Sequence, residues 1–319
     1  MTNQVENKQP INQASSQQQK KPVTCNQQAN QQLTKPTTNN QRPINQAKTP
    51  VVVITIDDNS PDPKPWVQVQ DPDDPDSTFI LYEDARSNIL KKTHRLCYSE
   101  IHAGQVLLKI KFPCVDGLHD PDIADTLVAP AISEFVHIIN TGHHWVCLST
   151  ISCRPATIKI YDSLFQRLTP IAIRHSCRML MHAGDSILFL NEKVQKQTNM
   201  SDCGLFALAY ATDLGYGIDP VTQENLRAHY VSCLDSLEMV PFPRVSRRVP
   251  YHPSNHRTTV PIFCACRRPN DNKEYVQCSH CNRWYHPTCV NIPDWVINSK
   301  RKWRCDTCRG KNARNFHLH

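Results

Sequence analysis

The sequence is poor in glycine, in aromatic residues and in long hydrophobic runs. Only 8 of its 319 residues are Gly, 7% are aromatic, and residues 1–50 contain no aromatic side chain. The apolar run VVVITI (51–56) is far shorter than the roughly 20 residues that cross a bilayer as a helix. The first ten residues, MTNQVENKQP, have no apolar run either. We therefore expect neither a signal peptide nor a membrane partner.

The cysteines lack the regular pairing of a secreted disulfide scaffold. Eight of the 15 Cys residues are scattered through residues 1–250, and seven lie within residues 251–319. An odd and uneven set of this kind indicates a reducing compartment. Positive charge is distributed in the same way, because residues 251–319 hold 12 Lys and Arg against 4 Asp and Glu, while the rest of the chain holds 24 against 25. The net charge of +7 thus belongs to the C-terminal part.

The N-terminal region has too few apolar side chains to form a core. Residues 1–50 contain 12 Gln and 8 Asn, and the stretch DPDDPDS (71–77) adds Pro and repeated Asp. Such a composition cannot bury enough apolar surface to offset the entropy of ordering the chain. We predict that residues 1–77 are disordered and that a compact domain begins at Thr78.

Residues 78–243 alternate between helical and strand patterns. Short β-branched or aromatic runs such as FVHIIN (135–140) predict strands. TPIAIRHSCRMLMHA (169–183) predicts an amphipathic helix. DCGLFALAYATDL (202–214) predicts a helix that is apolar on nearly every face and should therefore lie buried at the centre. The pattern indicates an α+β domain, which a basic linker over residues 244–260 would follow.

Residues 261–310 contain four close pairs of metal-ligand side chains. Thiolate and imidazole ligands in such pairs suit two tetrahedral zinc ions, because each pair can hold a metal from one turn. A domain this small has little core of its own, so zinc binding must supply much of its folding free energy. The pairs are Cys264 and Cys266, Cys278 and Cys281, His286 and Cys289, and Cys305 and Cys308.

This spacing, with Trp284 and Tyr285 directly before His286, resembles a PHD finger over residues 262–309. A RING finger has a similar cross-brace, but its ligand order fits less well, which disfavours a modifier ligase. The resemblance implies that two zinc sites interleave within residues 261–310, ahead of a short tail over residues 311–319. One site would use Cys264, Cys266, His286 and Cys289, and the other Cys278, Cys281, Cys305 and Cys308.

Many PHD fingers bind histone tails, and some hold trimethyl-lysine between aromatic rings, whose faces attract a quaternary ammonium. By this resemblance, Phe263, Tyr275 and Trp284 are candidates for a methyl-lysine cage. The alternative is that Phe263 and Trp284 only pack the small core. The basic run KRKWR (300–304) could also contact DNA phosphates weakly.

Four side chains of the larger domain suit nucleophilic catalysis by a thiol. Cys203 is expected at the N-terminus of the buried helix, where the helix dipole and unpaired N–H groups lower the pKa of a thiol. His144, at the start of a strand, could act as base and acid, and Asp162, at the end of the next strand, could orient its ring. Gln197 could stabilise an oxyanion together with the backbone N–H of Cys203. The alternative is a core cysteine with surface histidines.

The order of these motifs resembles the ubiquitin-like-protein cysteine proteases of the SUMO type, which have an adenain-like, papain-type fold. The matching motifs are His144-Trp145, then Tyr-Asp-Ser around Asp162, then Gln197 six residues before Cys203. The resemblance implies that Cys203 is the nucleophile, His144 the base and acid, Asp162 the orienting acid and Gln197 the oxyanion donor.

The resemblance also implies a narrow substrate tunnel. Trp145 would cover this tunnel, which admits only a Gly-Gly C-terminus. The family often has Trp-Leu-x-Asp ahead of its first helix, and here the corresponding stretch begins with Arg95 and ends with Tyr98. This departure bears on the shape of the tunnel and on which modifier is cleaved.

The segment VVVITIDD (51–58) has the composition of a SUMO-interacting motif. Such motifs are short Val and Ile runs flanked by acids, and they add a strand to the edge of SUMO. The alternative is that the segment forms an edge strand on the protease itself.

These patterns predict a nuclear cysteine peptidase or isopeptidase. It would cleave after the Gly-Gly C-terminus of a ubiquitin-like protein, with SUMO as the first candidate, and a zinc-binding PHD finger would direct it to histone tails. The alternative is a catalytically inactive scaffold that binds chromatin, or an accessory protein encoded by a transposon. The pairing of the two domains resembles proteins carried by eukaryotic DNA transposons.

Overall fold

The computed structural model describes the chain from residue 62 to residue 310, with gaps. The predicted disorder of residues 1–61, the candidate SUMO-interacting segment 51–58 and the tail 311–319 lie outside the described residues. Within the described part, no helix has both the length and the apolar character needed to cross a membrane. The described residues are 62–72, 76–120, 131, 133–165, 167–180, 184–220, 222–245, 251, 256–266, 274–292, 294–297, 299 and 302–310.

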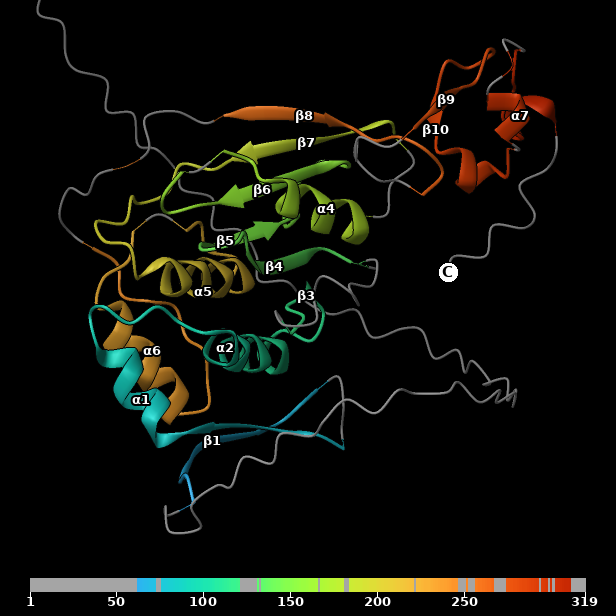
Figure 1. Cartoon of the computed structure of the whole chain (residues 1–319). Helices are drawn as coiled ribbons and strands as arrows, with labels where there is room; N and C mark the ends of the chain where they lie inside the picture. The colour runs from blue at the N-terminus through green and yellow to red at the C-terminus, as the bar shows by residue number, and fades with distance from the viewer. Residues whose placement is uncertain are drawn as a thin grey trace, which may run out of the picture.

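A six-stranded sheet forms the centre of the larger domain (Figure 1). The pairs β3–β4 and β6–β7 are parallel, and the other neighbouring strands are antiparallel. In spatial order the strands are β3 (Asp116–Gly117), β4 (Phe135–Asn140), β5 (Trp145–Ser149), β6 (Thr157–Tyr161), β7 (Ser186–Asn191) and β8 (Arg257–Pro261).

Helices cover both faces of this sheet, which explains why its inner strands read as continuous apolar runs. Along β4, Val136 and Ile138 pack into the core on the side of α5 (Cys203–Gly215). Phe135 and Ile139 point to the opposite side, into the core that includes α4 (Pro170–Met179). All of α5 is buried, as its uniformly apolar sequence predicted.

A second helical layer packs on the outer side of α5. It contains α1 (Glu83–Leu90), α2 (Tyr98–Lys111), α6 (Leu226–Asp235) and the hairpin of β1 (Pro65–Gln70) with β2 (Thr78–Tyr82). The approach of α2 to α5 is so close that a Cβ on Gly104 would lie 2.5 Å from Cδ2 of Leu208. Gly104 therefore permits the contact between the two helices.

The zinc module follows the sheet in the chain. It consists of the two-stranded sheet of β9 (Val276–Gln277) and β10 (Trp284–Tyr285), the short helix α7 (Asp294–Ile297) and two 3-10 turns, η1 (Pro287–Val290) and η2 (Thr307–Arg309). Its core contains buried Trp303, whose ring makes an edge contact with Tyr285 at a centroid distance of 5.5 Å.

Two strands lie where the sequence predicted none. β1 falls within the predicted disordered region 1–77, because PWVQVQ alternates and buries Val67 against the helical layer. β8 covers the last four residues of the predicted linker 244–260 together with Pro261, and it pairs antiparallel with the otherwise free edge of β7. Both predictions were wrong at these residues, since a half-exposed edge strand carries a weak apolar signal.

Candidate active site and zinc module

Cys203 is the first residue of α5 and is buried, with 2% of its surface exposed. Burial raises the pKa of its thiol, but a hydrogen bond with His144 and backbone groups of Trp145 and Gly204 bring the pKa below its ordinary value. The chain is tightly packed here, since a Cβ on Gly204 would lie 2.9 Å from Cδ1 of Ile101. The start of α5 is therefore closely packed, and it places the thiol at the positive end of the helix dipole.

His144 and Asp162 meet because β5 and β6 are antiparallel neighbours, so that the start of one strand lies beside the end of the other. Nε2 of His144 lies 2.6 Å from Oδ1 of Asp162, and both side chains are buried. Among the described residues, the buried Nδ1 of His144 has no hydrogen-bond partner, and Cys203 lies close enough to raise the pKa of the imidazole. The ring thus bridges the carboxylate and the thiol.

The pKa of His144 reflects this bridging position. Burial lowers the pKa, but the hydrogen bond with Asp162 and the interaction with Cys203 outweigh burial and raise it to about 9. A raised imidazole pKa beside a lowered thiol pKa favours the imidazolium–thiolate pair near neutral pH.

Gln197 lies in the loop between β7 and α5 and is 4% exposed. The hydroxyl of Ser163 donates to its Oε1, and its Nε2 donates to the backbone oxygen of Asn199 at 2.6 Å. These two contacts fix which way the amide faces. The sequence predicted Gln197 as a site residue but assigned no role to Ser163 or Asn199.

Trp145 is buried beside the Cys203 thiol. Its Nε1 donates to the backbone oxygen of Leu96 at 3.1 Å. The ring of Tyr98 makes an edge contact with the Trp145 ring at a centroid distance of 5.1 Å, and Tyr98 is 39% exposed. An aromatic wall therefore forms from Tyr98 and Trp145, although Arg95 occupies the position where a Trp was expected and is exposed.

The eight predicted zinc ligands gather into two groups of four. Within each group the ligand atoms lie within 4.8 Å of one another. The Sγ atoms of Cys281 and Cys305 are 3.8 Å apart, which matches the separation of about 3.8 Å for two thiolates on one tetrahedral zinc. The groups are Cys264, Cys266, His286 and Cys289, and Cys278, Cys281, Cys305 and Cys308.

These ligands fit two zinc ions in the interleaved order of a cross-brace. Nδ1 of His286 faces Cys266 at 3.3 Å and Cys289 at 3.8 Å, which identifies Nδ1 as its ligand atom. The backbone N–H of Cys305 donates to Sγ of Cys278 at 3.3 Å, as is common around thiolate ligands. Zinc bound here would supply folding free energy to the module.

Two of the three cage candidates lie together. The rings of Phe263 and Tyr275 are 5.7 Å apart at 61°. Trp284 is 42% exposed, and its backbone oxygen accepts from the N–H of Cys264 at 2.8 Å, so the chain at Phe263 runs beside β10. Neither Phe263 nor Trp284 belongs to the buried core cluster around Trp303, although Phe263 is half-buried.

Comparison with known families agrees with this division of the chain. Residues 131–228 match the Ulp1 protease family, C-terminal catalytic domain, and residues 264–308 match the PHD-finger family. The region similar to the Ulp1 family thus precedes the region similar to PHD fingers along the chain.

Curated relatives match through the PHD finger. Set1 complex component spp1 of Schizosaccharomyces pombe is 35% identical over 48 residues, which are 15% of this chain and 11% of the relative. Nucleosome-remodeling factor subunit NURF301 of Drosophila melanogaster is 33% identical over 60 residues, 18% of this chain and 2% of the relative. The chain thus spans about a tenth or less of the length of these relatives.

A solved structure is similar to about half of this chain. It is the C-terminal Ulp1 protease domain in complex with Smt3, the yeast orthologue of SUMO. The alignment covers 54% of this chain and 89% of that chain, with 12% identity and a TM-score of 0.42.

Proposed function

We propose that this protein is a cysteine peptidase that cleaves after the Gly-Gly C-terminus of a ubiquitin-like modifier, with SUMO as the first candidate. The observation that carries the proposal is the buried contact of His144 with Asp162 beside the thiol of Cys203. A structural cysteine has no need of a lowered pKa, whereas a nucleophile depends on the thiolate.

In the proposed reaction the Cys203 thiolate attacks the carbonyl carbon of the last glycine. Charge develops on the carbonyl oxygen, which the amide of Gln197 and the backbone N–H of Cys203 would stabilise. The imidazolium of His144 then protonates the leaving amine, and a thioester joins Cys203 to the modifier. Water, deprotonated by the neutral His144, hydrolyses the thioester and restores the thiol.

The aromatic wall supports the Gly-Gly preference. Trp145 is held by Leu96 and covered edge-on by Tyr98, and Leu96 also lies 3.1 Å from the point that a Cβ on Gly204 would occupy. A substrate tunnel bounded by such closely packed groups would favour residues without side chains beside the scissile bond.

The PHD finger is proposed to bind a histone tail and so to keep the enzyme in the nucleus. Its relatives carry names of chromatin complexes, and the exposed Trp284 with Phe263 and Tyr275 suits a methylated lysine. Asp162 follows β6, which runs parallel to β7, so it lies at the end of the sheet where β7 also ends. The zinc module follows β8, which runs antiparallel to β7, so it begins at the end of the sheet where β7 starts. The tail-binding surface and the catalytic site therefore lie at opposite ends of the sheet (Figure 1).

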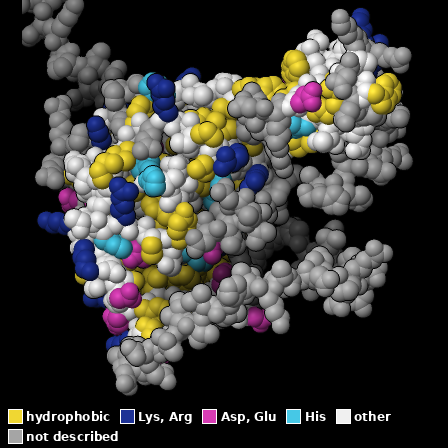
Figure 2. Space-filling model, viewed as in Figure 1, with side chains coloured by type: hydrophobic (Ala, Val, Ile, Leu, Met, Phe, Trp, Pro, Cys, Tyr) yellow, Lys and Arg dark blue, Asp and Glu magenta, His cyan; other side chains and the backbone are white. Residues whose placement is uncertain are grey.

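Weak DNA contact is proposed for the basic part of the zinc module. On the face in Figure 2, the described Lys and Arg side chains of the sheet domain are spread among polar, apolar and His side chains. Lys302 and Arg304, by contrast, are two exposed basic residues close together in the zinc module.

The test treats the full chain with SUMO, ubiquitin and other modifiers that carry a C-terminal electrophile. We expect a covalent adduct with one modifier, and no adduct with Cys203→Ala. Cys233→Ala, which removes another buried thiol, serves as the matched control and should be labelled like the wild type. A folded wild-type protein that no modifier labels would overturn the proposal.

The second candidate function is a scaffold that binds a modifier without cleaving it. The observation that favours it is Tyr98, which covers Trp145 where the family often has Asp. Tight binding of a modifier by a wild-type protein that forms no adduct would support the scaffold. The likeness of this domain pairing to proteins of DNA transposons stays a prediction, which the genomic surroundings of the gene would test.

A further inference from the structure

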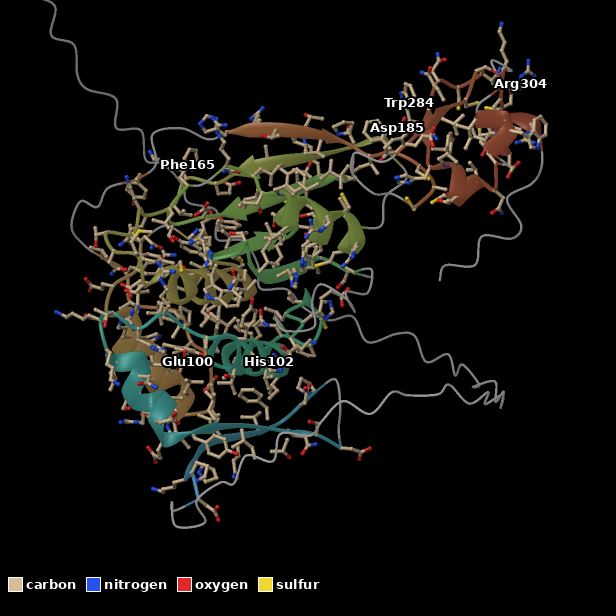
Figure 3. All side chains as sticks on the ribbon, viewed as in Figure 1. Glu100, His102, Phe165, Asp185, Trp284 and Arg304 are labelled. Atoms are coloured by element: carbon tan, nitrogen blue, oxygen red, sulfur yellow. The ribbon has the colours of Figure 1, made fainter. Side chains whose placement is uncertain are left out.

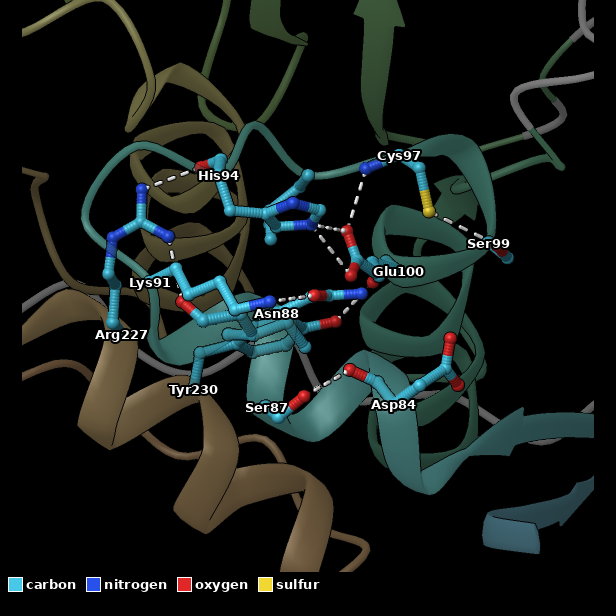
Figure 4. A network of polar contacts seen from close by, with 12 residues as sticks. Asp84, Ser87, Asn88, Lys91, His94, Cys97, Ser99, Glu100, Arg227 and Tyr230 are labelled. Carbon is cyan, nitrogen blue, oxygen red and sulfur yellow. Dashed lines mark hydrogen bonds and ion pairs between the residues drawn. The ribbon is translucent and has the colours of Figure 1, made fainter. Parts of the chain in front are cut away.

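Arg227, near the start of α6, makes an unusual number of contacts for one side chain. Its guanidinium donates to one backbone oxygen at the end of α1 and to two in the segment between α1 and α2, and only 12% of the side chain is exposed. Figure 4 shows its contact with the His94 carbonyl. The three acceptors are the oxygens of Ile89 at 2.7 Å, His94 at 2.8 Å and Lys92 at 3.3 Å.

The same guanidinium also reaches the residue before the nucleophile. Nη2 of Arg227 lies 2.5 Å from Oδ1 of Asp202, and the Asp202 side chain is 18% exposed. The segment between α1 and α2 that Arg227 contacts also contains Leu96, whose backbone oxygen accepts a hydrogen bond from the Trp145 indole. Arg227 thus joins the aromatic wall to the start of α5.

From Asp202 the contacts continue to the oxyanion donor. The other carboxylate oxygen of Asp202 accepts from Nδ2 of Asn199 at 2.6 Å. The backbone oxygen of Asn199 accepts from Nε2 of Gln197 at 2.6 Å. Oδ1 of Asn199 holds the backbone N–H groups of Ser201 and Asp202, at 2.9 and 3.0 Å. An uninterrupted chain of hydrogen bonds therefore runs from Arg227 to the amide of Gln197.

We propose that Arg227 is a positioning residue that, through Asp202 and Asn199, aims the Gln197 amide at the developing oxyanion. Arg227 would touch neither the substrate nor the reacting atoms. The proposal rests on the proposed function, since an oxyanion forms only if Cys203 attacks a carbonyl. Oxyanion donors act only when they are held in place before the reaction, so a misplaced Gln197 loses most of its effect.

A cavity of about 480 Å³ makes the proposal directly testable. Gln197, Asn199, Asp202 and Arg227 all line this cavity. If Arg227 is shortened to Ala, free guanidinium ion can enter from the cavity and take the place of the lost group. Such rescue would not repair a general loss of packing.

The first experiment compares Arg227→Ala with Arg86→Ala. Arg86 also pairs with an aspartate, Asp235, through two contacts at 3.0 and 3.2 Å between α1 and the end of α6, and so is a control for the loss of an arginine ion pair in the same helical layer. With a modifier whose C-terminus carries a fluorogenic amide, we expect Arg227→Ala to lower kcat about tenfold with KM nearly unchanged. Millimolar guanidinium should restore most of the loss, and Arg86→Ala should keep wild-type kcat with or without it.

A double-mutant cycle tests the route through Asp202. Asp202→Asn alone should lower kcat, and Arg227→Ala should cost little more in that background, because both changes break the same connection. Fully additive losses, or no rescue by guanidinium, would overturn the proposal.

A measurement without turnover separates this proposal from the proposed function. The side-chain amide signals of Gln197, assigned by NMR with Gln197→Glu, should shift in Arg227→Ala, return with guanidinium and stay in place in Arg86→Ala. Unmoved Gln197 signals overturn the positioning role whatever the activity. If the wild type alkylates Cys203 no faster than an ordinary thiol and turns over no modifier, the proposed function fails, while the NMR result still decides the positioning role.

Discussion

Nε2 of His144 lies 2.6 Å from Oδ1 of Asp162, and the Cys203 thiol also raises the pKa of the same ring. The imidazole is therefore held between a carboxylate and a thiol, and its protonation depends on both. This contact links the pKa of His144, about 9, to the lowered pKa of Cys203. It sets the pH range in which the imidazolium–thiolate pair exists.

The rate of modifier cleavage should have a plateau around neutral pH. On the acid side the rate falls as the Cys203 thiolate gains a proton, and on the alkaline side it falls near pH 9 as His144 loses one. Asp162→Asn removes the group that raises the His144 pKa, so the alkaline limb should move to lower pH and kcat/KM should fall about 100-fold.

A suitable control for this profile is Glu100→Gln. It alters another histidine–carboxylate contact, that of His94 with Glu100 at 2.8 Å, which is not part of the proposed triad (Figure 4). This variant should keep both limbs of the wild-type profile. An alkaline limb that does not move in Asp162→Asn would mean that Asp162 does not control His144.

Gln197→Ala should separate oxyanion stabilisation from thiol reactivity. We expect kcat for the modifier amide to fall about 100-fold, the usual cost of losing one oxyanion donor. Alkylation of Cys203 by iodoacetamide forms no oxyanion, so its rate and pH dependence should stay at wild-type values. The control is Gln195, which lies in the same loop as Gln197 and whose side-chain oxygen accepts a hydrogen bond from the backbone N–H of Gln223. Gln195→Ala breaks this contact and should keep wild-type kcat.

The parts of the fold that the sequence predicted well are those with a strong local pattern. Helix α5 is apolar on nearly every face and is wholly buried. The close spacing of the eight metal ligands in the sequence predicted their two groups. His144 and Asp162 lie 18 residues apart on neighbouring strands, so a hairpin argument is enough to bring them together.

The parts that the sequence did not predict depend on contacts between distant residues. The strand β8 reads RTTVP, mostly exposed, and becomes a strand only because the edge of β7 is free. Arg227 donates a hydrogen bond to the carbonyl of Ile89, 138 residues earlier in the chain. Every residue has a backbone carbonyl, so the sequence does not indicate which one an arginine will contact. The grouping of the metal ligands and the contact of His144 with Asp162 were therefore predictable, whereas the contacts that support them were not.

Removal of zinc should loosen the edge of the protease sheet as well as the zinc module. Ile262 directly follows β8 and is buried in the core on the α4 side, while Cys264 is a zinc ligand only two residues later. The N–H of Ile262 donates to the oxygen of Asp185 at 2.8 Å, and Arg283 of the zinc module pairs with the Asp185 carboxylate at 3.1 Å. Figure 3 labels Asp185 and Trp284 at this junction.

Zinc binding stabilises the folded state that holds the ligands, so its removal lowers the free energy of unfolding. We expect two zinc ions per chain by metal analysis. A chelator should increase hydrogen exchange in β9 and β10 and also in β8, but not in β5 at the centre of the sheet. Unchanged exchange in β8 would mean that the two parts fold independently.

Ile262→Ala tests the same junction without disturbing the metal. Loss of this buried side chain should lower the free energy of unfolding by about 2 kcal/mol, with zinc content unchanged. Thr259→Ala changes an exposed residue of the same strand and should stay within about 0.5 kcal/mol of the wild type. Equal effects of the two variants would show that Ile262 does not anchor β8.

Trp284→Ala should weaken the binding of a histone peptide that carries trimethyl-lysine about tenfold, and should leave the unmodified peptide nearly unaffected. The reason is that Trp284 is exposed beside the chain at Phe263 and outside the core around Trp303, so its ring is free to face a quaternary ammonium. Trp295→Ala, another exposed Trp of the same module, is the matched control for lost apolar surface. Calorimetric titration of both variants with both peptides decides the matter, since equal affinity of the wild type for the two peptides would exclude a methyl-lysine cage.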